Sequence, residues 1–342
     1  MNNNLRHFLL RSNFLLSFLY FTKRCVYEKK FFREIERRKS LCLFDVDELS
    51  KPLSICPIDY CPDNNMYGLS AILKEYCGLP LSKPIKACIE HGLYFGDYVS
   101  KDEKYYPKSL KIVTFSNYRE EKIKKTSCKR DIFLIGPYIK YAHSLLSEDE
   151  ISKIKQQYGR ILLVFPLHSI VGADNNFNFK ELINEIFRQK ARFDSIWICV
   201  YYLDLLKIDI IDEYRRNGFK IVTCGHKYDL NFMNRQRTLI ELSAGTMSND
   251  VGTHVGYSIA LNKPHYIYRQ EVETCYANEV IKKKHADNII QETSSVYKNE
   301  REEVYKAFSS DDFVITSAQQ NLIEKYWGSL TPLSPNILQS LK

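Results

Sequence analysis

The sequence predicts an α/β protein with two domains, each built around a parallel sheet, that face each other across a cleft and follow an amphipathic helical segment. Its 342 residues are enough for about two domains at roughly 150 residues each. Apolar residues make up 44% of the chain and charged residues 26%, which is typical of a globular protein and excludes a disordered or multi-span membrane protein. Short runs of Ile, Leu, Val and Phe alternate with helix-like stretches, as in parallel sheets that are buried on both faces.

Residues 1–39 predict a basic amphipathic helix that lies on a membrane surface. They hold ten Lys and Arg against three Glu, whereas the rest of the chain is almost neutral. A nucleic-acid-binding protein would carry its basic excess on the folded body, so we expect an anionic membrane surface as partner and no nucleic acid. The apolar run from residue 8 to 21 is too short to span a bilayer, which takes about 20 apolar residues. An ordinary helix that caps a domain fits the pattern equally well.

The apolar and basic positions of this segment recur at helical spacings. The apolar residues are Phe8, Leu9, Leu15, Leu16, Phe18, Leu19 and Phe21. The basic residues are Arg6, Arg11, Lys23, Arg24, Lys29 and Lys30. We expect the first set to enter the acyl chains and the second to meet anionic headgroups, each basic residue adding about 1 kcal/mol. A secretory signal is a weaker alternative, because no small-residue cleavage site follows.

The remaining elements divide into three parts. Residues 40–150 form the first domain, with strands expected at 41–46, 87–90, 111–115 and 131–135. Residues 151–298 form the second domain, with strands at 160–165, 195–201, 219–223, 238–242 and 265–268 and helices at 179–190 and 205–216. Residues 299–342 are expected to pack across the domains as helices, at 303–308 and 319–327. Open parallel sheets bind ligands at their strand ends, so we expect the site in the cleft.

Several common sites are excluded by the sequence. It contains no G-x-x-x-x-G-K-[ST] and no G-x-G-x-x-G, so a P-loop or a standard dinucleotide site has no support. The ten cysteines are scattered and several lie inside apolar runs, which is typical of reduced, buried cysteines in a cytosolic protein. Cys56, Cys61, Cys77 and Cys88 have no common zinc spacing, so we expect no metal site there.

The stretch 239–268 is the most informative for chemistry. An expected strand leads into a loop rich in Ser, Thr and Gly, and a helix follows. Such a loop presents backbone N–H groups at the positive end of a helix, where phosphate or carboxylate binds. The candidate donor-binding residues are Ser248, Asn249, Gly252, Thr253 and Gly256. The alternative is a plain helix capped by Ser248 or Thr253.

Two further strand ends of the second domain carry candidate donor-binding residues. Gly225 and His226 follow the strand at 219–223, and Arg235 comes soon after and could pair with a phosphate through its planar guanidinium. His168 and Ser169 follow the strand at 160–165. A solvated surface position for Arg235 and a helix cap for Ser169 are the alternatives.

The first domain contributes a candidate general base. His91 lies beside a glycine directly after the strand at 87–90, and Asp97 is close in sequence. A histidine or carboxylate at a strand end can take the proton from an acceptor hydroxyl. A lone histidine is more often structural, but a strand-end glycine allows a substrate to approach closely.

These stretches resemble bacterial O-antigen and capsular polysaccharide glycosyltransferases of the GT-B architecture, in which two Rossmann-like domains face a central cleft. The resemblance rests on the His91-Gly92 turn, on Phe165 to Ser169, on Gly225-His226, and on Ser248 to Gly256 followed by Lys263-Pro264. It implies a nucleotide-sugar donor and a polyprenyl-diphosphate-linked oligosaccharide acceptor. It also implies a peripheral location on the cytoplasmic face of the bacterial inner membrane.

Within this class the chain looks similar to enzymes that use CMP-sialic acid, although Ser169 rather than proline follows His168. Similarity to teichoic-acid polymerases implies a CDP-polyol phosphotransferase instead, and a non-catalytic membrane-associated scaffold is a third alternative. Asp45 and Asp47 form an Asp-x-Asp, which can hold a divalent cation against a nucleotide diphosphate. Because only 44 residues precede it, we interpret both as surface or helix-start residues. We therefore expect chemistry with no metal and no cofactor beyond the donor.

Overall fold

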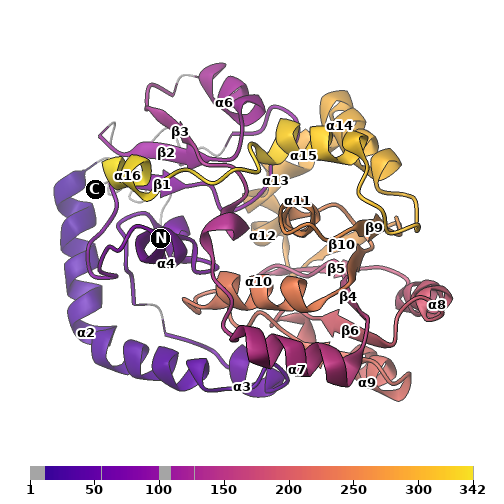
Figure 1. Ribbon diagram of the computed structural model, residues 1–342. Helices are drawn as coiled ribbons and strands as arrows, with labels where there is room; N and C mark the ends of the chain where they lie inside the picture. The colour runs from indigo at the N-terminus through magenta and orange to yellow at the C-terminus, as the bar shows by residue number, and fades with distance from the viewer. Residues whose placement is uncertain (1–11, 55, 100–108, 127, 342) are drawn as a thin grey trace.

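The computed structural model describes residues 12–54, 56–99, 109–126 and 128–341. Most of their strands form two separate parallel sheets (Figure 1). The first sheet has three strands in the order β1-β2-β3: β1 (Ala87–Ile89), β2 (Lys111–Thr114) and β3 (Ile132–Leu134). Helices α4 (Leu69–Tyr76) and α6 (Asn117–Lys124) belong to this domain. β1 and most of β2 are fully buried, as expected for a sheet that is covered on both faces.

The second sheet has five parallel strands in the order β7-β6-β4-β8-β9. They are β4 (Ile161–Phe165), β6 (Ser195–Cys199), β7 (Lys220–Val222), β8 (Gly245–Ser248) and β9 (His265–Ile267). Along the chain the sheet grows from β4 toward β7 and then continues on the other side of β4 with β8 and β9. This reversal makes a topological switch point between β4 and β8, the place where sheets of this kind bind ligands.

Five helices connect these strands or lead into them: α7 (Glu148–Tyr158), α8 (Phe179–Gln189), α9 (Ile208–Arg216), α10 (Phe232–Leu242) and α11 (Thr253–Ala260). α7 starts sharply because Ser147 and Glu150 form a capping box. It ends at Gly159, whose φ of 65° favours glycine. The helix therefore has local start and stop signals although none of its residues is buried.

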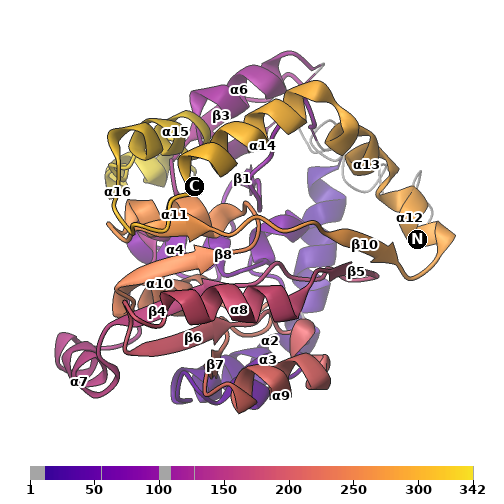
Figure 2. The same cartoon turned by 90° about the vertical axis from the view of Figure 1, so that its right-hand side faces the viewer.

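The end of the chain crosses from the second domain back to the first. β10 (Glu273–Tyr276) pairs antiparallel with β5 (Ala173–Asn176), and α12 (Glu279–Lys284), α13 (Ala286–Thr293) and α14 (Ser295–Ala307) follow. α15 (Ser317–Trp327) packs against both α6 and α11, and Figure 2 shows α14 and α15 next to α6. After α16 (Pro335–Leu338) the Leu341 carbonyl accepts a bond from the Lys86 N–H (2.7 Å), so the chain ends beside β1.

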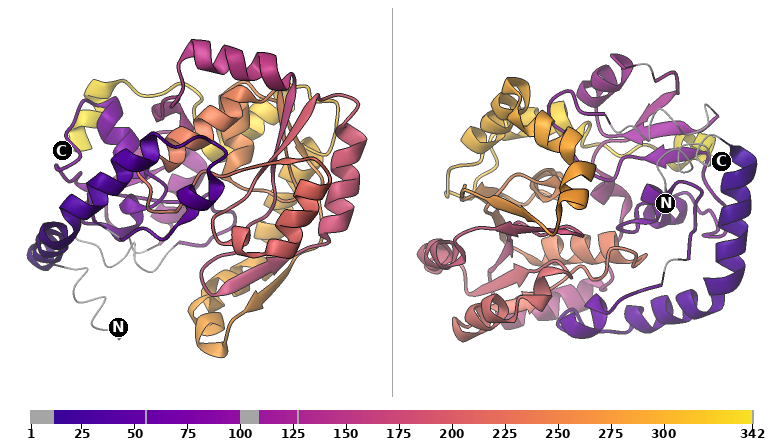
Figure 3. Two further views of the ribbon diagram at one scale, coloured as in Figure 1. Left: turned by 90° about the horizontal axis from the view of Figure 1, so that it is seen from below. Right: turned by 180° about the vertical axis from the view of Figure 1, so that it is seen from behind.

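A long helix, α2 (Asn13–Lys39), precedes the first domain and runs along the outer edge of the molecule in the rear view of Figure 3. Its C-terminal half is anchored by Phe31 and Ile35 and by Arg38, which is 1% exposed and donates to the Leu49 and Lys51 carbonyls. The short helix α3 (Val46–Ser50) follows. None of the helices in the described ranges combines the length and the apolar character needed to cross a bilayer. Arg6, Phe8, Leu9 and Arg11 lie outside the described residues.

Two predicted strands are wrong. Residues 238–242 form the last turns of α10, and the strand is β8, three residues later. α10 is buried on most of its surface, so its apolar residues show no helical period that would separate it from a strand. Residues 41–46 make a turn that Asp45 holds by accepting the Cys42 N–H (2.8 Å), and Asp45 is the N-cap residue of α3.

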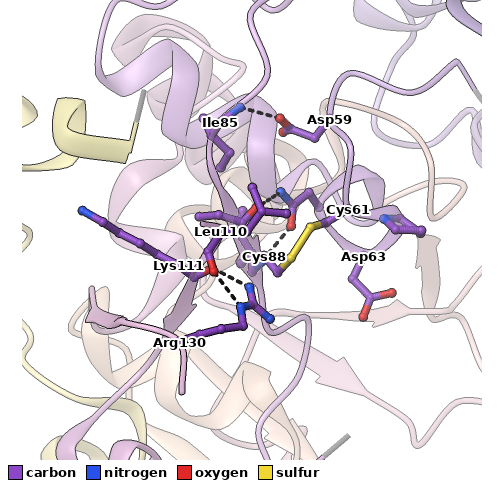
Figure 4. The surroundings of a disulfide bond; sticks show 12 residues. Asp59, Cys61, Asp63, Ile85, Cys88, Leu110, Lys111 and Arg130 are labelled. Atoms are coloured by element: carbon purple, nitrogen blue, oxygen red, sulfur yellow. Dashed lines mark hydrogen bonds between the residues drawn. A yellow bond between two sulfur atoms is a disulfide. The ribbon is translucent and has the colours of Figure 1, made fainter. Parts of the chain in front are cut away.

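The expectation of reduced, buried cysteines is also wrong in part. Cys61 and Cys88 form a disulfide (Figure 4), and Cys25, Cys42 and Cys275 are exposed. The disulfide joins the segment before the 3₁₀ helix η1 (Pro62–Asn65) to the middle of β1. Leu16 of α2 packs in the same apolar cluster, so the bond also lies beneath the N-terminal helix.

Candidate functional site

A cavity of about 340 Å³ lies between the two domains at the carboxyl ends of their strands. The first domain contributes His91 and Gly92 after β1, together with Tyr67. The second contributes the ends of β6 and β7 and the segments that follow β4 and β8. Within each sheet the strands are parallel, so their carboxyl ends lie at one edge. The cavity is lined from these edges of both sheets. This arrangement is that of a two-domain protein with its ligand site in the cleft.

The two segments at the switch point are held together by Asn249. Its Oδ1 accepts the Leu167 N–H (2.7 Å), and its Nδ2 donates to Gln270 (3.1 Å). The side chain is fully buried and does not line the cavity. Asn249 therefore positions the loops after β4 and β8, whereas the sequence predicted that it contacts the donor.

The N-terminus of α11 opens onto the cavity. Gly252 is the N-cap residue, no side chain among the described residues caps the helix, and both Gly252 and Thr253 line the cavity. A Cβ on Gly252 would lie 2.7 Å from the His254 ring, which explains why glycine stands there. An uncapped helix start combines unsatisfied N–H groups with the positive end of the helix dipole, so it can hold an anion.

His254 and His168 line the cavity next to this helix start. The His254 ring stacks on Phe165 with a centroid distance of 5.0 Å, and its Nε2 is buried with no hydrogen-bond partner in the described part of the chain. Burial and the neighbouring His168 lower the pKa of His254 to about 3, so its ring is neutral at pH 7. The His168 Nδ1–H donates to the Ser169 carbonyl (2.8 Å), and the ring packs on Tyr201.

Behind the helix start, a buried network fixes the loop. Ser248 donates to the Asp250 carbonyl (2.7 Å) and contacts His265 Nε2 (3.0 Å), while His265 Nδ1 lies 2.7 Å from Thr246 Oγ1. Burial lowers the pKa of His265 well below its usual value. Ser248 is fully buried and does not line the cavity, so it holds the loop in shape and leaves the contact with a ligand to Gly252 and Thr253.

Across the cavity, His91 forms a pair with a carboxylate. Its Nδ1 lies 3.3 Å from Asp63 Oδ2, and Asp63 belongs to η1. The disulfide that joins Cys61 to Cys88 links the two segments that carry this pair (Figure 4). A carboxylate on Nδ1 fixes the orientation and tautomer of an imidazole and leaves Nε2 to act as a base.

The structure does not bring Asp97 into the site. Its carboxylate is 60% exposed, outside the residues that line the cavity, and ion-paired with Lys122 at 2.8 Å. This pairing lowers the pKa of Asp97, which makes the carboxylate a weaker base. Of the two candidate bases, His91 alone lines the cavity.

Four predicted donor-binding residues lie in the core of the second domain. Arg235 is 2% exposed, pairs with Asp229 (2.9 Å) and donates to the Cys224 carbonyl. Gly225 packs on the Arg235 guanidinium. His226 is buried against Tyr202 and Tyr228, and burial lowers its pKa to about 4. Ser169 is also buried, where Lys207 donates to its hydroxyl (2.9 Å). None of the four lines the cavity.

Gly256 is a packing residue. A Cβ there would lie 2.4 Å from the Trp327 ring, and the Trp327 Nε1–H donates to the Thr253 carbonyl (3.2 Å). The glycine thus allows α15 to pack closely on α11. Through this contact the C-terminal helices support the helix start that faces the cavity.

Several residues in or next to the cavity were not predicted from the sequence. Asp63 and Tyr67 come from a segment without a motif, and the Tyr67 hydroxyl lies 3.3 Å from that of Tyr201 across the domains. Arg301 of α14 forms an ion pair with Asp250 in the loop before α11. The adjacent Glu300 accepts the Gly96 N–H (2.6 Å), so α14 connects the first-domain loop after β1 to the second-domain loop after β8.

No group of three or more His, Cys, Asp and Glu side chains in the described ranges lies close enough together to hold a metal ion. The groups that could meet a charged ligand are the N–H groups at the start of α11 and the hydroxyl and imidazole groups around them. These can bind the phosphates of a nucleotide without a cation.

No family model and no curated protein matches the chain. Among solved structures, the chain is similar to the wall teichoic acid polymerase TagF at 12% identity and a TM-score of 0.36, covering 70% of this chain and 57% of the polymerase. It is also similar to UGT71G1 of Medicago truncatula complexed with UDP-glucose (12%, 80% and 68% covered, TM-score 0.31). The pneumococcal O-GlcNAc transferase GtfA in complex with UDP and GlcNAc matches at 11%, with 80% and 54% covered and a TM-score of 0.31.

Identities of 11% and 12% and TM-scores of 0.31 and 0.36 are too low to assign an activity to this chain. The architecture is evident from the chain itself: two parallel-sheet domains, a C-terminal segment that crosses between them, and a cavity at the facing strand ends. The chain therefore has an α/β fold of the GT-B-like kind, with two Rossmann-like domains facing a central cleft and a long N-terminal helix.

Proposed function

We propose that this protein is a glycosyltransferase that moves a sugar from a nucleotide donor to an acceptor hydroxyl. The observation that carries the proposal is the uncapped start of α11 at the topological switch point, open to the cavity that His91 lines from the other domain. The N–H groups at the helix start can bind the donor phosphate, and the strand ends around it can bind the rest of the nucleotide. The histidine across the cavity suits proton removal.

In the proposed reaction, His91 Nε2 takes the proton of the acceptor hydroxyl while Asp63 holds the ring through Nδ1. The acceptor oxygen bonds to the anomeric carbon of the sugar, and the bond from that carbon to the donor phosphate breaks. The electron pair leaves with the phosphate oxygen. The N–H groups at Gly252 and Thr253 would stabilise the negative charge that develops there, as preorganised electrostatic groups do.

A panel of UDP, GDP, CMP and CDP tests the donor site. A nucleotide present at 100 times its Kd stabilises a protein by about 2.7 kcal/mol, which a thermal-shift measurement detects. We expect one of the four to raise the Tm. A protein that binds none of them would be a scaffold with an inactive cleft.

The matching sugar nucleotide, including CMP-sialic acid if CMP binds, then serves as donor in a product assay. A product without phosphorus identifies glycosyl transfer, whereas one that gains phosphorus would identify polyol-phosphate transfer. We expect activity to persist in EDTA, because we propose that protein groups rather than a cation stabilise the leaving phosphate. Loss of turnover in EDTA that added Mg²⁺ restores would contradict a metal-independent reaction.

His91→Ala tests the base. We expect a turnover about 10² to 10⁴ times lower with unchanged nucleotide affinity, because only proton removal is lost. His143→Ala is the matched control, since that histidine is 57% exposed and outside the cavity. Turnover of His91→Ala equal to that of the control would remove His91 from the reaction.

We further propose that the acceptor is a lipid-linked oligosaccharide of O-antigen or capsule assembly and that the enzyme works on the inner membrane. Support comes from α2, where Phe14, Phe18 and Phe21 form an apolar stripe and are 76%, 57% and 64% exposed. The exposed Lys23, Lys29 and Lys30 lie on the same helix. An apolar stripe among basic residues is typical of a helix that lies in an anionic membrane surface.

A further inference from the structure

A second cavity, of about 230 Å³, lies on the other side of the α11 start. Its walls are the loop after β1, the loop before α11, and helices α13 and α14. Figure 2 shows these two helices in sequence above β10. The cavity is thus closed on one side by the C-terminal segment that crosses between the domains.

The two cavities meet at the residues that we assign to the reaction. Val251, Gly252 and Thr253 line both of them. His91 and Gly92 line the first, and Leu93 and Tyr94, the next residues along the chain, line the second. A molecule in the second cavity therefore has its end next to both the base and the helix start that would hold the donor phosphate. That is the place from which an acceptor hydroxyl must attack.

The side chains of the second cavity suit a sugar ring. Tyr94, Tyr98 and Tyr297 offer flat apolar faces with polar hydroxyl ends, and Gln291 offers an amide that both donates and accepts hydrogen bonds. The rings of Tyr94 and Tyr98 lie 5.6 Å apart. Arg119, which is buried and paired with Glu90, lies over the Tyr94 ring at 4.8 Å and donates to the Tyr98 carbonyl. The tyrosine pair is therefore held in place before any ligand arrives.

Away from the α11 start, which we assign to the donor phosphate, the charges around the cavity disfavour an anionic ligand. Arg301 is the only cation among the described residues that line it, and its guanidinium is already paired with Asp250 and bonded to the Tyr305 hydroxyl. Glu292 adds a carboxyl group to the wall. A phosphate on this wall would meet the Glu292 carboxyl group and a cation that Asp250 already neutralises, which costs free energy rather than gaining it.

We propose that this second cavity is the acceptor subsite and that it takes a neutral sugar terminus rather than a phosphate-bearing one. The proposal rests on the glycosyltransferase function above and names the chemical class of its acceptor. It also separates this chain from a transferase that extends a chain of polyol phosphates, whose acceptor end carries phosphate.

Saturation-transfer difference NMR with methyl glycosides of glucose, galactose and N-acetylglucosamine, and with glycerol 3-phosphate, tests the proposal. We expect at least one glycoside to receive saturation from the wild-type protein and glycerol 3-phosphate to receive none. Tyr98→Ala and Gln291→Ala should each reduce the glycoside signal at least fivefold, while the nucleotide affinity stays within twofold of wild type. Tyr27→Ala and Gln320→Ala, at exposed positions on α2 and α15, are the matched controls and should leave the signal unchanged.

Glycoside signals that survive both cavity variants, or binding of glycerol 3-phosphate in place of the glycosides, would overturn the acceptor subsite. Gln291 lies in the last turn of α13 and is only half-buried, so its variant should fold even if Tyr98→Ala does not. A nucleotide titration of the same samples distinguishes failure of the acceptor subsite from failure of the proposed glycosyltransferase function. If nucleotide binds and no glycoside does, only the acceptor subsite fails, whereas a wild-type protein that binds no nucleotide overturns the proposed function itself.

Discussion

At the scale of single residues, the predicted role of Arg235 differs from the position of its side chain in the structure. The sequence places it ten residues after a strand-end glycine, as expected for a phosphate-binding arginine. In the structure its guanidinium is turned into the core, where it neutralises Asp229, which is itself fully buried. A buried charge needs a partner, and Asp229 has Arg235 at 2.9 Å and the buried Arg38 at 4.0 Å.

Replacing Arg235 with alanine should therefore destabilise the fold. The Asp229 carboxylate would lose its hydrogen-bonded partner and keep only Arg38 at 4.0 Å. The free energy of unfolding should fall by up to about 3–5 kcal/mol in a denaturant titration. Arg216→Ala is the control, because that arginine is 69% exposed in a surface ion pair and should change stability by about 0.5 kcal/mol at most. Weaker nucleotide binding at unchanged stability would instead return Arg235 to the donor site.

Ser248, Asn249 and Ser169 are likewise predicted donor-binding residues whose side chains are buried away from the cavity. The predicted segments do lie at the ends of β4 and β8, beside the cavity, because strand ends and clusters of Ser, Thr and Gly are local features. Which side of a loop each side chain occupies depends on packing against distant residues, such as His265 for Ser248 and Gln270 for Asn249. Of the loop around α11, only Gly252 and Thr253 could be assigned to the cavity in advance and are found there.

At the scale of elements, the start of α11 is the feature on which the donor site depends. Thr253→Glu tests it with a single charge. The positive end of the helix dipole stabilises a carboxylate in the first turn. The free energy of unfolding should therefore stay the same or rise slightly, by about 0.3–1 kcal/mol. A nucleotide phosphate would be repelled, and calorimetry should show at least a tenfold weaker affinity.

Thr253→Gln is the neutral control of similar size and should bind nucleotide much more tightly than Thr253→Glu. Equal affinities for the two variants would mean that no phosphate lies at this helix start. The comparison does not depend on which of the four nucleotides is the donor.

Among the other elements, the strands that were predicted correctly are short runs of Ile, Leu, Val and Phe with turn residues at both ends, such as β4 and β6. The errors have a physical cause in each case. The end of α10 is a helix buried on most sides, which removes the period that identifies helices, and the run at 41–46 supplies two buried residues, Leu43 and Val46, to different apolar clusters. Neither fact is visible without the tertiary structure.

At the scale of the whole molecule, three histidines with lowered pKa values should make the fold sensitive to acid. Burial lowers the pKa of His226 to about 4, that of His254 to about 3, and that of His265 well below its usual value. The unfolded chain takes up these protons near pH 6.5 and the folded chain only at lower pH. Stability should thus be constant above about pH 7 and fall below it, by about 1.4 kcal/mol per pH unit for each histidine.

Thermal unfolding between pH 7.5 and 5 measures this effect. His265→Gln should reduce the slope of stability against pH by about one proton, whatever its effect on stability at pH 7.5. The exposed His143→Gln should leave the slope unchanged. A wild-type stability that does not change over this range would contradict the lowered pKa values of these histidines.

The stripe on α2 predicts membrane binding of the whole protein. We expect co-sedimentation with vesicles that contain phosphatidylglycerol and much less with vesicles of phosphatidylcholine alone, and the binding should weaken as salt is added. Phe18→Ser combined with Phe21→Ser should abolish it. Leu206→Ser, at an apolar residue that is 77% exposed on the second domain, should not.

The two sheets and the cleft between them follow from the order of strands and helices along the chain, which is why the architecture could be predicted. The contacts between distant segments, within the first domain and between the two domains, could not. The Cys61–Cys88 disulfide, the pairing of Asp63 with His91 and the link that α14 makes through Glu300 and Arg301 all join segments that are distant in sequence. No local pattern of residues predicts which distant segments meet.

The central claim is that a nucleotide binds at the start of α11 between the two domains. Hydrogen-exchange mass spectrometry, with and without the nucleotide that raises the Tm, measures it most directly. We expect slower exchange in peptides that cover residues 249–256 and 166–169, at the ends of β8 and β4, and no change in peptides of α9 on the far edge of the second sheet. Protection that spares residues 249–256 while appearing elsewhere would contradict the proposed site and the function built on it.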